Sequence, residues 1–451
     1  MATTTATPVA HRTVLFLAMC TGIFLVLLDV TALNVALPDI ASGLHAGSRL
    51  AWAVDGYAVP FAALLLLGGT IGDLAGHRGV VLAGLTVFGL GSLGCALATG
   101  MGTLVAARAV QGAGAALLLP GTLAVITRAY PEPTERARAI GLWSAIGALS
   151  APAGQVMGGL LVQWTGWRAV FWLNLPLVAG ALIATVLVVP ADRGDRGRRP
   201  DVPGTALAVL GLAGVVYSVV EAQLPVLLLG VAALVAFVVV ESRTAEPMLP
   251  LSLFRNRAFG FANGAALVMN AATLGSLFLL SQLLQGVQGR SAATAGLAVL
   301  PAFLLLVVVG PVGGRLVGRY GARRLIVAGA AICAVGLAML ALSGPHTGYL
   351  VLAPALVVWG FGLGLLTPAV VSGAVGAVPD RRAGLASAVS NTARQTGGAV
   401  GVAACGAVAG PIGGTAFSTG FRYAVLAGAA AFAVTATATL IGYPRPSHAA
   451  A

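Results

Sequence analysis

Two charged side chains within long apolar segments are the residues of this sequence whose type and position suggest chemistry. Asp29 interrupts "FLVLLDVTALNVALP", and Arg108 lies in "RAVQGAGAALLLP". An apolar segment of about 20 residues is long enough for a helix to cross a bilayer. Because an ionisable group inside such a segment is costly, its presence there usually marks a functional site. Asp29 is therefore the first candidate for a group that binds and releases a proton.

The expected depths of Asp29 and Arg108 would allow an ion pair between them. Asp29 follows the expected cytoplasmic start of its helix by about sixteen residues, a rise of about 24 Å. Arg108 lies about six residues, or about 9 Å, from the outer start of its own helix. In a hydrocarbon core of about 30 Å, both side chains then lie in the outer third. Such a pair could serve proton or cation coupling, or it could be purely structural.

Two further charges lie in apolar segments. Asp55, in "WAVDGYAVP", is expected close to the outer end of its helix. It is either an interfacial residue or part of a path for substrate or protons. Arg394 is expected near the middle of its helix, with no acid in the same span. It could pair with Asp29, donate to backbone carbonyls or contact an anionic group of a substrate.

The composition requires a membrane protein. The 451 residues are 58% hydrophobic and only 8% charged, whereas soluble domains carry about 25% charged residues. The net charge of +12 comes from arginines in short loops between apolar segments. This pattern indicates a topology signal and contact with anionic lipid headgroups, and it argues against a nucleic-acid partner. We therefore expect an all-α protein with many membrane spans.

Fourteen membrane spans are predicted from hydropathy. Their boundaries are 13–36, 51–71, 79–99, 102–126, 138–161, 167–190, 203–220, 224–240, 258–283, 293–314, 323–343, 348–370, 383–405 and 418–442. Most arginines fall in the loops that follow even-numbered spans, so those loops and both termini should be cytoplasmic. The expected location is a bacterial cytoplasmic membrane.

Three segments recur in order at an offset of about 245 positions. "GTIGDLAGHRGVVLAG" matches "GRLVGRYGARRLIVAG", "GAGAALLLP" matches "GFGLGLLTP", and "ERARAIG" loosely matches "DRRAGLA". The offset fits two six-helix halves separated by two additional spans. The expected division is a first bundle at 1–190, a two-helix linker at 191–247 and a second bundle at 248–451. Repeated membrane halves with a site at their interface are typical of transporters.

The sequence lacks the residue patterns that an enzyme, a metal site or a nucleotide-driven pump would need. The four cysteines and five histidines are scattered, and their spacing predicts no metal site, disulfide or nucleophile–base pair. No phosphate-binding loop of the G-x-x-x-x-G-K-[ST] type occurs, and every basic residue is arginine. We therefore expect neither an enzyme nor a nucleotide-driven pump, and no cofactor.

Several segments resemble the major facilitator superfamily, and within it the fourteen-helix drug:proton antiporters. "GTIGDLAGHRG" is similar to the signature loop of the superfamily, although Leu74 stands where a basic residue is usual. "LDVTALNVALP", "RAVQGAGAALLLP" and "NTARQTGGAVG" resemble segments of the first, fourth and penultimate helices. "GQVMGG" resembles the antiporter segment of helix five, with Gln155 in place of a proline. The resemblance extends over nearly the whole chain.

The resemblance implies an alternating-access exporter of amphipathic or cationic drugs, driven by protons and acting as a monomer among membrane lipids. A dedicated exporter of one metabolite or antibiotic, or an uncoupled facilitator, is the alternative. In the signature loop, Asp73 could cap the helix that begins near Ala383, or pair with Arg138, and so stabilise one conformation. The implied site residues are Asp29 and Arg108 for coupling; Asp55, Asn34, Gln111 and Arg394 for substrate; Gly69, Asp73, Gly76 and Arg78 for gating; and Gly154, Gln155, Gly158 and Gly159 in helix five.

Overall fold

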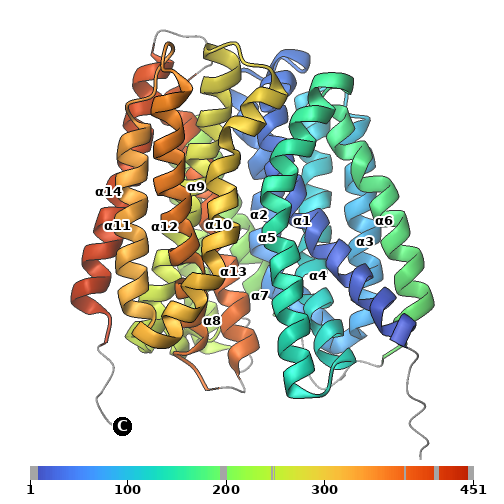
Figure 1. The fold of residues 1–451 in the computed structure, drawn as a ribbon. Helices are drawn as coiled ribbons and strands as arrows, with labels where there is room; N and C mark the ends of the chain where they lie inside the picture. Colours follow the sequence, from blue (N-terminus) through green and yellow to red (C-terminus); the bar gives the residue numbers. More distant parts are fainter. Residues whose placement is uncertain are drawn as a thin grey trace, which may run out of the picture.

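The computed structural model describes residues 9–192, 201–244, 247, 249–379, 382–410 and 416–444. Within these residues it contains fourteen α-helices of 19 to 35 residues (Figure 1). In chain order they are α1 (Val9–Gly43), α2 (Ala51–Ala75), α3 (His77–Ala96), α4 (Met101–Ala129), α5 (Pro133–Thr165), α6 (Arg168–Val188), α7 (Val202–Glu221), α8 (Leu224–Arg243), α9 (Arg257–Gln282), α10 (Ala292–Tyr320), α11 (Ala322–Leu340), α12 (Tyr349–Val375), α13 (Ala383–Ala409) and α14 (Phe417–Gly442).

Several of these helices begin at a polar residue whose side chain caps the first turn. The Glu132 carboxylate accepts from the Glu135 amide at the start of α5, and Asp201 accepts from the Gly204 amide at 2.9 Å at the start of α7. Ser291 caps α10 in the same way. These side chains satisfy amides that the first turn of a helix leaves unpaired. The helices therefore extend past the apolar spans into the loops.

Twelve helices in the described part of the chain are long and apolar enough to cross a membrane. This is a multi-pass membrane protein, as expected. Two helices are outside this set. In α2 only the stretch Ala51–Leu65 is identified as apolar, which is shorter than a membrane span, and α13 contains the polar run "SNTARQTGG". Ala58 and Ala62 of α2 pack with Ala399 and Ala403 of α13, so part of each helix faces protein. Fourteen crossings therefore stay a prediction for these two.

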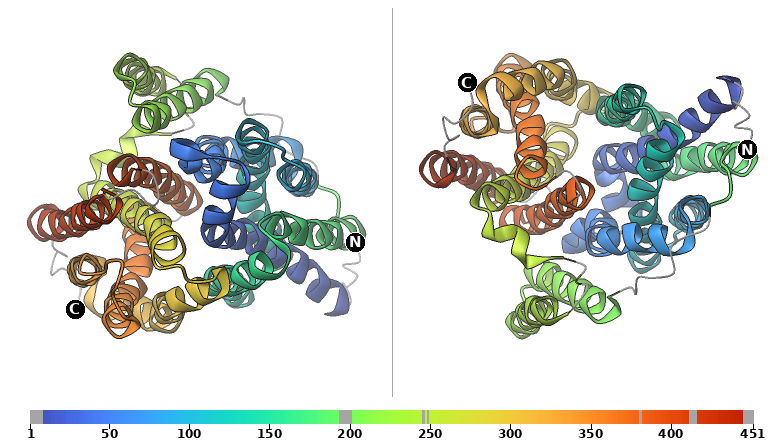
Figure 2. Two further views of the ribbon diagram at one scale, coloured as in Figure 1. Left: turned by 90° about the horizontal axis from the view of Figure 1, so that it is seen from above. Right: turned by 90° about the horizontal axis from the view of Figure 1, so that it is seen from below.

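The helices form two bundles, α1–α6 and α9–α14, which face each other, while α7 and α8 lie to one side (Figure 2). The start of α1 and the end of α14 lie at the same end of the molecule, here called the terminal end (Figure 1). α7 packs against α2 and α13, the helices that meet between the bundles. The boundaries at 190 and 247 remain a proposal that agrees with this packing.

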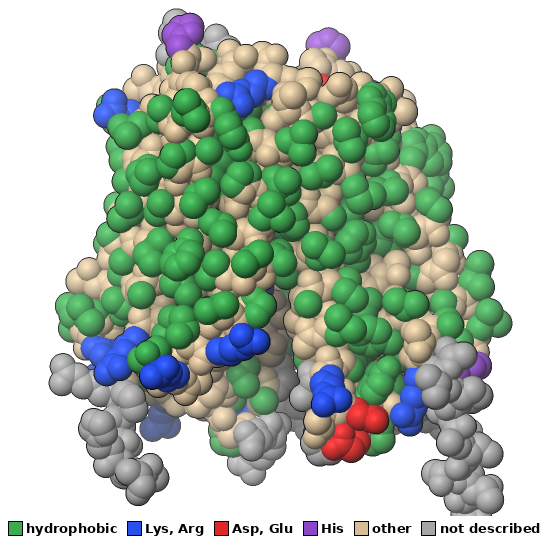
Figure 3. All heavy atoms as spheres, viewed as in Figure 1, with side chains coloured by type: hydrophobic (Ala, Val, Ile, Leu, Met, Phe, Trp, Pro, Cys, Tyr) green, Lys and Arg blue, Asp and Glu red, His purple; other side chains and the backbone are tan. Residues whose placement is uncertain are grey.

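Apolar side chains cover most of the face shown in Figure 3, and arginines gather near the terminal end. Many leucines among the described residues are exposed; Leu350, for example, is 89% exposed. An apolar belt with charges at its ends is what a bilayer requires of the protein surface. The surface therefore matches the membrane location inferred from hydropathy.

The internal repeat is visible in the packing of corresponding glycines. Gly76, between α2 and α3, and Gly321, between α10 and α11, have positive φ angles of 91° and 81°. A Cβ on Gly112 of α4 would come within 2.3 Å of the Tyr57 carbonyl, and one on Gly360 of α12 would come within 2.3 Å of the Ala302 carbonyl. α4 thus approaches α2 as α12 approaches α10. Small residues at these crossings permit such close contact between membrane helices.

Candidate functional site

The centre of the first bundle contains a completely buried ion pair between α1 and α4. The Arg108 guanidinium donates from Nη1 to Oδ2 of Asp29. Both side chains are inaccessible to solvent. The structure thus brings together the two residues that sequence reasoning selected for coupling, and their role in proton movement stays a prediction.

Polar side chains from α3, α4 and α6 complete the surroundings of Asp29. Its Oδ1 accepts from Gln111 Nε2 at 2.8 Å and from Asn174 Nδ2 at 3.1 Å. Ser92 Oγ accepts from the same two amides, at 2.9 Å and 3.3 Å. All of these side chains are buried. We call Asp29, Arg108, Gln111, Asn174 and Ser92 the Asp29 network.

Arg108 is also held by α2 and by its own helix. Its Nε donates to the Ala53 carbonyl at 2.9 Å, and its Nη1 donates to Gln111 Oε1 at 2.6 Å. The guanidinium carbon lies 4.4 Å from the centre of the Tyr57 ring, a distance suited to a cation–π interaction. The close crossing of α2 and α4 at Gly112 brings Tyr57 to this position.

The Asp29 network can hold a buried negative charge because every oxygen of the carboxylate has a donor. Removing one partner of a buried pair leaves an uncompensated charge and costs about 3–5 kcal/mol. A proton arriving at Asp29 would cancel that charge and weaken the hold on Arg108. The arrangement can therefore convert protonation into a change in the contacts of α1 with α4.

Asp55 lies in the second turn of α2, and its role as an interfacial residue or as part of a path for substrate or protons stays a prediction. Its side chain is completely buried in α2, and neither of its carboxylate oxygens has a hydrogen-bond partner among the described residues. It lies one turn before Ala58, on the helix that packs against α13. Burying an ionised carboxylate without a partner is costly. Asp55 is thus a second buried acid, separate from the Asp29 network.

Arg394 lies in α13, in the second bundle, and Asp29 takes its donors from the first bundle. The Nε atom of Arg394 is buried and has no partner in the described part of the chain. The pairing of Arg394 with Asp29 that the sequence left open is therefore absent from this conformation of the described residues. Arg394 keeps donor capacity for another conformation or for a substrate group.

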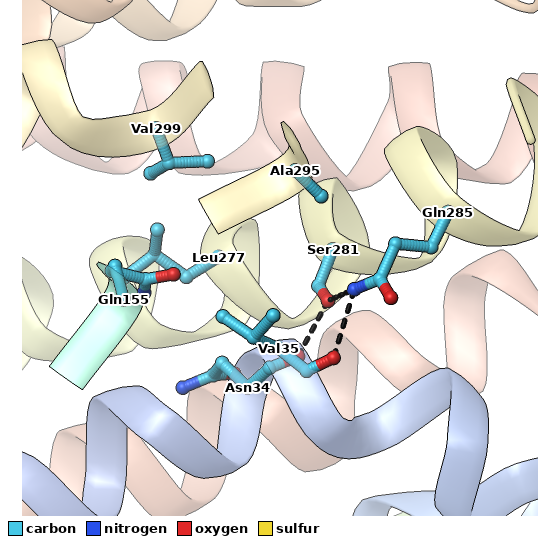
Figure 4. A pocket seen from close by; sticks show the side chains of 8 residues that line it. All are labelled: Asn34, Val35, Gln155, Leu277, Ser281, Gln285, Ala295 and Val299. Carbon is cyan, nitrogen blue, oxygen red and sulfur yellow. Dashed lines mark hydrogen bonds between the residues drawn. The ribbon is translucent and has the colours of Figure 1, made fainter. Parts of the chain in front are cut away.

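A hydrogen-bonded contact joins α1 of the first bundle to α9 of the second bundle (Figure 4). Ser281 Oγ of α9 donates to the Asn34 carbonyl of α1, and Gln285 Nε2 donates to the Val35 carbonyl at 2.9 Å. Gln285 belongs to a π-helical turn, Leu283–Val287, that continues α9. Its amide also donates to Ser281 Oγ at 3.1 Å. We call these contacts the α1–α9 seal.

The cavity beside the α1–α9 seal is about 10 Å³ in volume. It holds about one water molecule at most, so it is closed to a drug-sized compound in this conformation. The amide oxygen of Asn34 is buried there without a partner among the described residues, and Gln155 lines the same cavity (Figure 4). Asn34 and Gln155 are thus placed between the bundles, and contact of Asn34 with substrate stays a prediction.

The glycines of the helix-five segment allow α5 to pack closely against α1 on one side and α10 on the other. A Cβ on Gly154 would meet Thr31 Oγ1 at 2.1 Å, and one on Gly158 would meet the Ala32 Cα at 2.8 Å, both in α1. On the other side, a Cβ on Gly159 would meet the Ala292 carbonyl of α10 at 2.8 Å. The segment therefore allows α5 to touch both bundles. It has this geometry with Gln155 in place of the usual proline.

The signature loop is anchored within the first bundle by Asp192, a residue that sequence reasoning missed. Asp192 accepts from the backbone amides of His77 and Arg78 at 2.8 Å and 3.0 Å, and it pairs with Arg128 at 2.5 Å. Burial raises the pKa of Asp192, but these amides and the charges of His77 and Arg128 outweigh burial and hold that pKa below its usual range.

Gly76 and Gly69 belong to the same loop region. Gly76 supplies the positive φ that lets α2 pass directly into α3, and Gly69 faces Pro120 of α4. The side chain of Asp73 lies outside the described residues, so the proposed contacts of Asp73 with the start of α13 or with Arg138 stay predictions.

Two residues of the Asp29 network, Asn174 and Ser92, were missed by the sequence analysis. The available signal was a polar residue inside an apolar segment. Asn174 in "FWLNLPLV" and Ser92 in "GLGSLGC" are such residues. A sequence cannot show that both reach the same carboxylate, because their helices meet only in the folded bundle.

Comparison with known proteins identifies the family. The sequence profile described as "Major Facilitator Superfamily" matches residues 19–402. The chain is 37% identical over 410 residues to the multidrug resistance protein Stp of Mycobacterium tuberculosis, covering 88% of this chain and 76% of Stp. It is 38% identical over 402 residues to the methylenomycin A resistance protein of Streptomyces coelicolor, covering 87% and 84% of the two chains.

Two further comparisons agree. The chain is 40% identical over 400 residues to the cephamycin export protein CmcT of Amycolatopsis lactamdurans, covering 85% and 82% of the two chains. The fold is similar to that of the nucleoside transporter NupG, with a TM-score of 0.68, 13% identity, and coverage of 95% of this chain and 100% of that one. The chain belongs to the major facilitator superfamily and is a membrane transporter rather than an enzyme.

Proposed function

We propose that this transporter exports amphipathic or cationic compounds, antibiotics among them, in exchange for protons. The relatives include multidrug resistance and antibiotic export proteins, and their names support the direction of transport and the class of substrate. The observation that carries proton coupling is the Asp29 network, a buried carboxylate whose charge is balanced by Arg108.

The proposed cycle couples the Asp29 network to the α1–α9 seal through α1. Asp29 and Asn34 are five residues apart, a rise of about 7.5 Å along one helix. In the described conformation the seal is closed. Protonation of Asp29 would free Arg108 and let α1 shift relative to α4. A shift of α1 would move the carbonyls of Asn34 and Val35 away from the α9 side chains and open the seal.

The site residues divide into two groups in this proposal. Gln111 belongs with the coupling residues, because its amide is engaged by Asp29, Ser92 and Arg108. Asn34, Asp55 and Arg394 remain candidates for substrate contact, since each has a buried polar atom without a partner among the described residues. Alternating access would expose these atoms to the transport path.

We also propose that the terminal end faces the cytoplasm, in a bacterial cytoplasmic membrane, with the transporter acting as a monomer. The arginines near that end support this orientation (Figure 3). A cysteine introduced at Arg319, in a variant without other cysteines, should be labelled only after a membrane-impermeant reagent gains access to the inside. Labelling of intact cells from outside would reverse the orientation.

The test of function is exchange in proteoliposomes. A fluorescent cationic dye is loaded inside, a pH gradient is imposed, and dye and proton movements are measured together. Asp29→Asn should abolish proton-driven dye movement while dye binding remains, because Asn keeps the shape of the side chain but cannot release a proton. Asp39→Asn, the same change in the same helix outside the Asp29 network, is the control. Coupled movement at the wild-type rate in Asp29→Asn would contradict proton coupling at this site.

A dedicated exporter of one antibiotic is the second candidate, because the names of the methylenomycin and cephamycin relatives each give a single compound. Susceptibility of an efflux-deficient host that expresses the protein separates the two candidates. Resistance to several unrelated dyes and antibiotics supports broad export, and resistance to one compound supports the dedicated exporter.

A further inference from the structure

A cavity of about 350 Å³ lies at the start of α1, between α4 and the segment that follows α6. Volumes of this size begin the range of small-ligand sites in proteins. We call it the α1–α4–α6 cavity. Its charged and titratable lining residues come from four elements: His11, Arg12, His77, Arg78, Arg128 and Asp192.

Positive charge dominates the α1–α4–α6 cavity. Three arginines line it with one acid, Asp192, whose charge is already matched by Arg128 at 2.5 Å. Arg12 meets Glu135 at 3.7 Å, but both side chains are largely exposed, at 42% and 54%, so this pair is weak. The cavity therefore keeps an excess of positive charge that an anion would neutralise.

The Nε atom of Arg78 is a further hydrogen-bond donor at this cavity. One guanidinium nitrogen donates to the Val186 carbonyl at 2.8 Å, while the buried Nε has no partner among the described residues. A guanidinium matches the oxygens of a phosphate group by donating from two nitrogens. Arg12 and Arg78, on two different helices, could thus bind one phosphate from two sides.

The surface next to the cavity is apolar. Val14 and Leu17 of α1 are 42% and 55% exposed, and Val186 and Leu187 of α6 are 51% and 70% exposed. α1 and α6 lie next to each other at this edge of the first bundle (Figure 2). An occupant with acyl chains could place them along these side chains while its headgroup enters the cavity. A free phosphate would use the arginines alone.

We propose that the α1–α4–α6 cavity binds the phosphate headgroup of an anionic phospholipid. Basic pockets between membrane helices at the membrane surface are suited to such headgroups. The bound lipid would join the ends of α1, α3, α4 and α6 on the edge of the first bundle that faces away from the second. This lipid site is separate from the path of the transported compound and from the Asp29 network.

The test uses the full-length protein, delipidated in detergent, and follows thermal unfolding by tryptophan fluorescence. Dioleoyl phosphatidylglycerol should raise the unfolding midpoint with saturation, and dioleoyl phosphatidylcholine should raise it far less. Arg12→Gln should raise the half-saturating concentration of phosphatidylglycerol about fivefold, the effect of one arginine near an anionic lipid surface. Because the Arg12 side chain is 42% exposed and has only a weak ion pair, this variant should fold normally.

Two more variants and one more ligand complete the test. Ala129→Met reduces the cavity volume without changing its charge and should also weaken phosphatidylglycerol binding. Arg319→Gln, at an exposed arginine near the end of α10 in the other bundle, should bind like wild type. The proposal is overturned if phosphatidylglycerol gives no saturable rise, if phosphatidylcholine matches it, or if Arg319→Gln weakens binding as much as Arg12→Gln. An equal rise with inorganic phosphate would assign the cavity to free phosphate instead.

Discussion

The side-chain amide of Gln285 in α9 donates to the backbone carbonyl of Val35 in α1 at 2.9 Å, and so connects the two bundles. The acceptor is a main-chain atom, so the bond depends on the position of α1 and not on the identity of residue 35. The π-helical turn at Leu283–Val287 places Gln285 at this point. Movement of α1 relative to α9 must break this bond.

Gln285→Leu should open the α1–α9 seal more often. The loss of one hydrogen bond, about 0.5–1.5 kcal/mol, would increase the open fraction roughly two- to tenfold. The measurement is the labelling rate of a cysteine placed at Val299, which lines the small cavity there, in a variant without other cysteines. Gln288→Leu is the control, because Gln288 donates within the second bundle, to the Gly344 carbonyl at 2.8 Å. An unchanged labelling rate would exclude a role of Gln285 in closure.

Asn174→Leu should slow proton-driven exchange. Asn174 donates to the carboxylate of Asp29 at 3.1 Å and to Ser92 Oγ at 3.3 Å, so the variant removes one of the donors that hold the buried charge. Loss of a hydrogen bond to a charged group costs about 1.5–3 kcal/mol. The rate of proton-coupled dye movement in proteoliposomes measures the effect. Asn263→Leu, which removes a buried amide that bonds to its own helix in the second bundle, is the control, and equal rates in the two variants would contradict a role of Asn174 at Asp29.

Asp192→Asn should lower stability at neutral pH but not in acid. The pKa of Asp192 is lower in the folded protein than its usual value. The stability from Asp192 is thus fully present above the unfolded pKa, about 3.9, and is lost as the pH falls through the folded pKa. Unfolding midpoints of wild type and variant should differ at pH 7 and converge as the pH falls below about 4. A constant difference down to the acid limit would show that the charge of Asp192 does not stabilise the loop.

Gly112→Ala should destabilise the protein, because its methyl group would meet the Tyr57 carbonyl of α2. Overpacking of this kind costs about 1–3 kcal/mol. The same substitution at Gly102, in the same helix with open space around it, should be neutral or stabilising by up to about 1 kcal/mol. Chemical unfolding in detergent compares the two variants. Equal effects would mean that helix propensity, not the approach of α4 to α2, decides stability here.

The sequence allowed the prediction of features that depend on local pattern. Hydropathy predicted the helices, and the three repeated segments predicted two similar six-helix halves. The depths of Asp29 and Arg108 along their helices showed that an ion pair between them was geometrically possible. These inferences needed only the pitch of a helix and the thickness of a bilayer.

Features that depend on the rotation of helices about their axes were not predicted. The burial of Asp55 follows from the face of α2 that meets α13, and hydropathy does not report that face. Ser281 and Gln285 donate to backbone carbonyls of α1. Because every residue has such a carbonyl, the sequence of α1 cannot indicate these contacts. Asp192 follows the end of α6, and its contact with the amides at the start of α3 arises only when the two helix ends come together.

The position of α7 and α8 beside α2 and α13 gives the protein one flank that an additional helix covers and one flank that no additional helix covers. α7 packs over part of the line where α2 and α13 meet and separates that part from the surrounding lipid. On the opposite flank, α5 and α10 meet without a covering helix (Figure 2). If the contact of α5 with α10 loosened in another conformation, a compound dissolved in the bilayer would reach the space between the bundles sideways along these two helices. Lateral access to this transporter would then be one-sided, although its two halves are built alike.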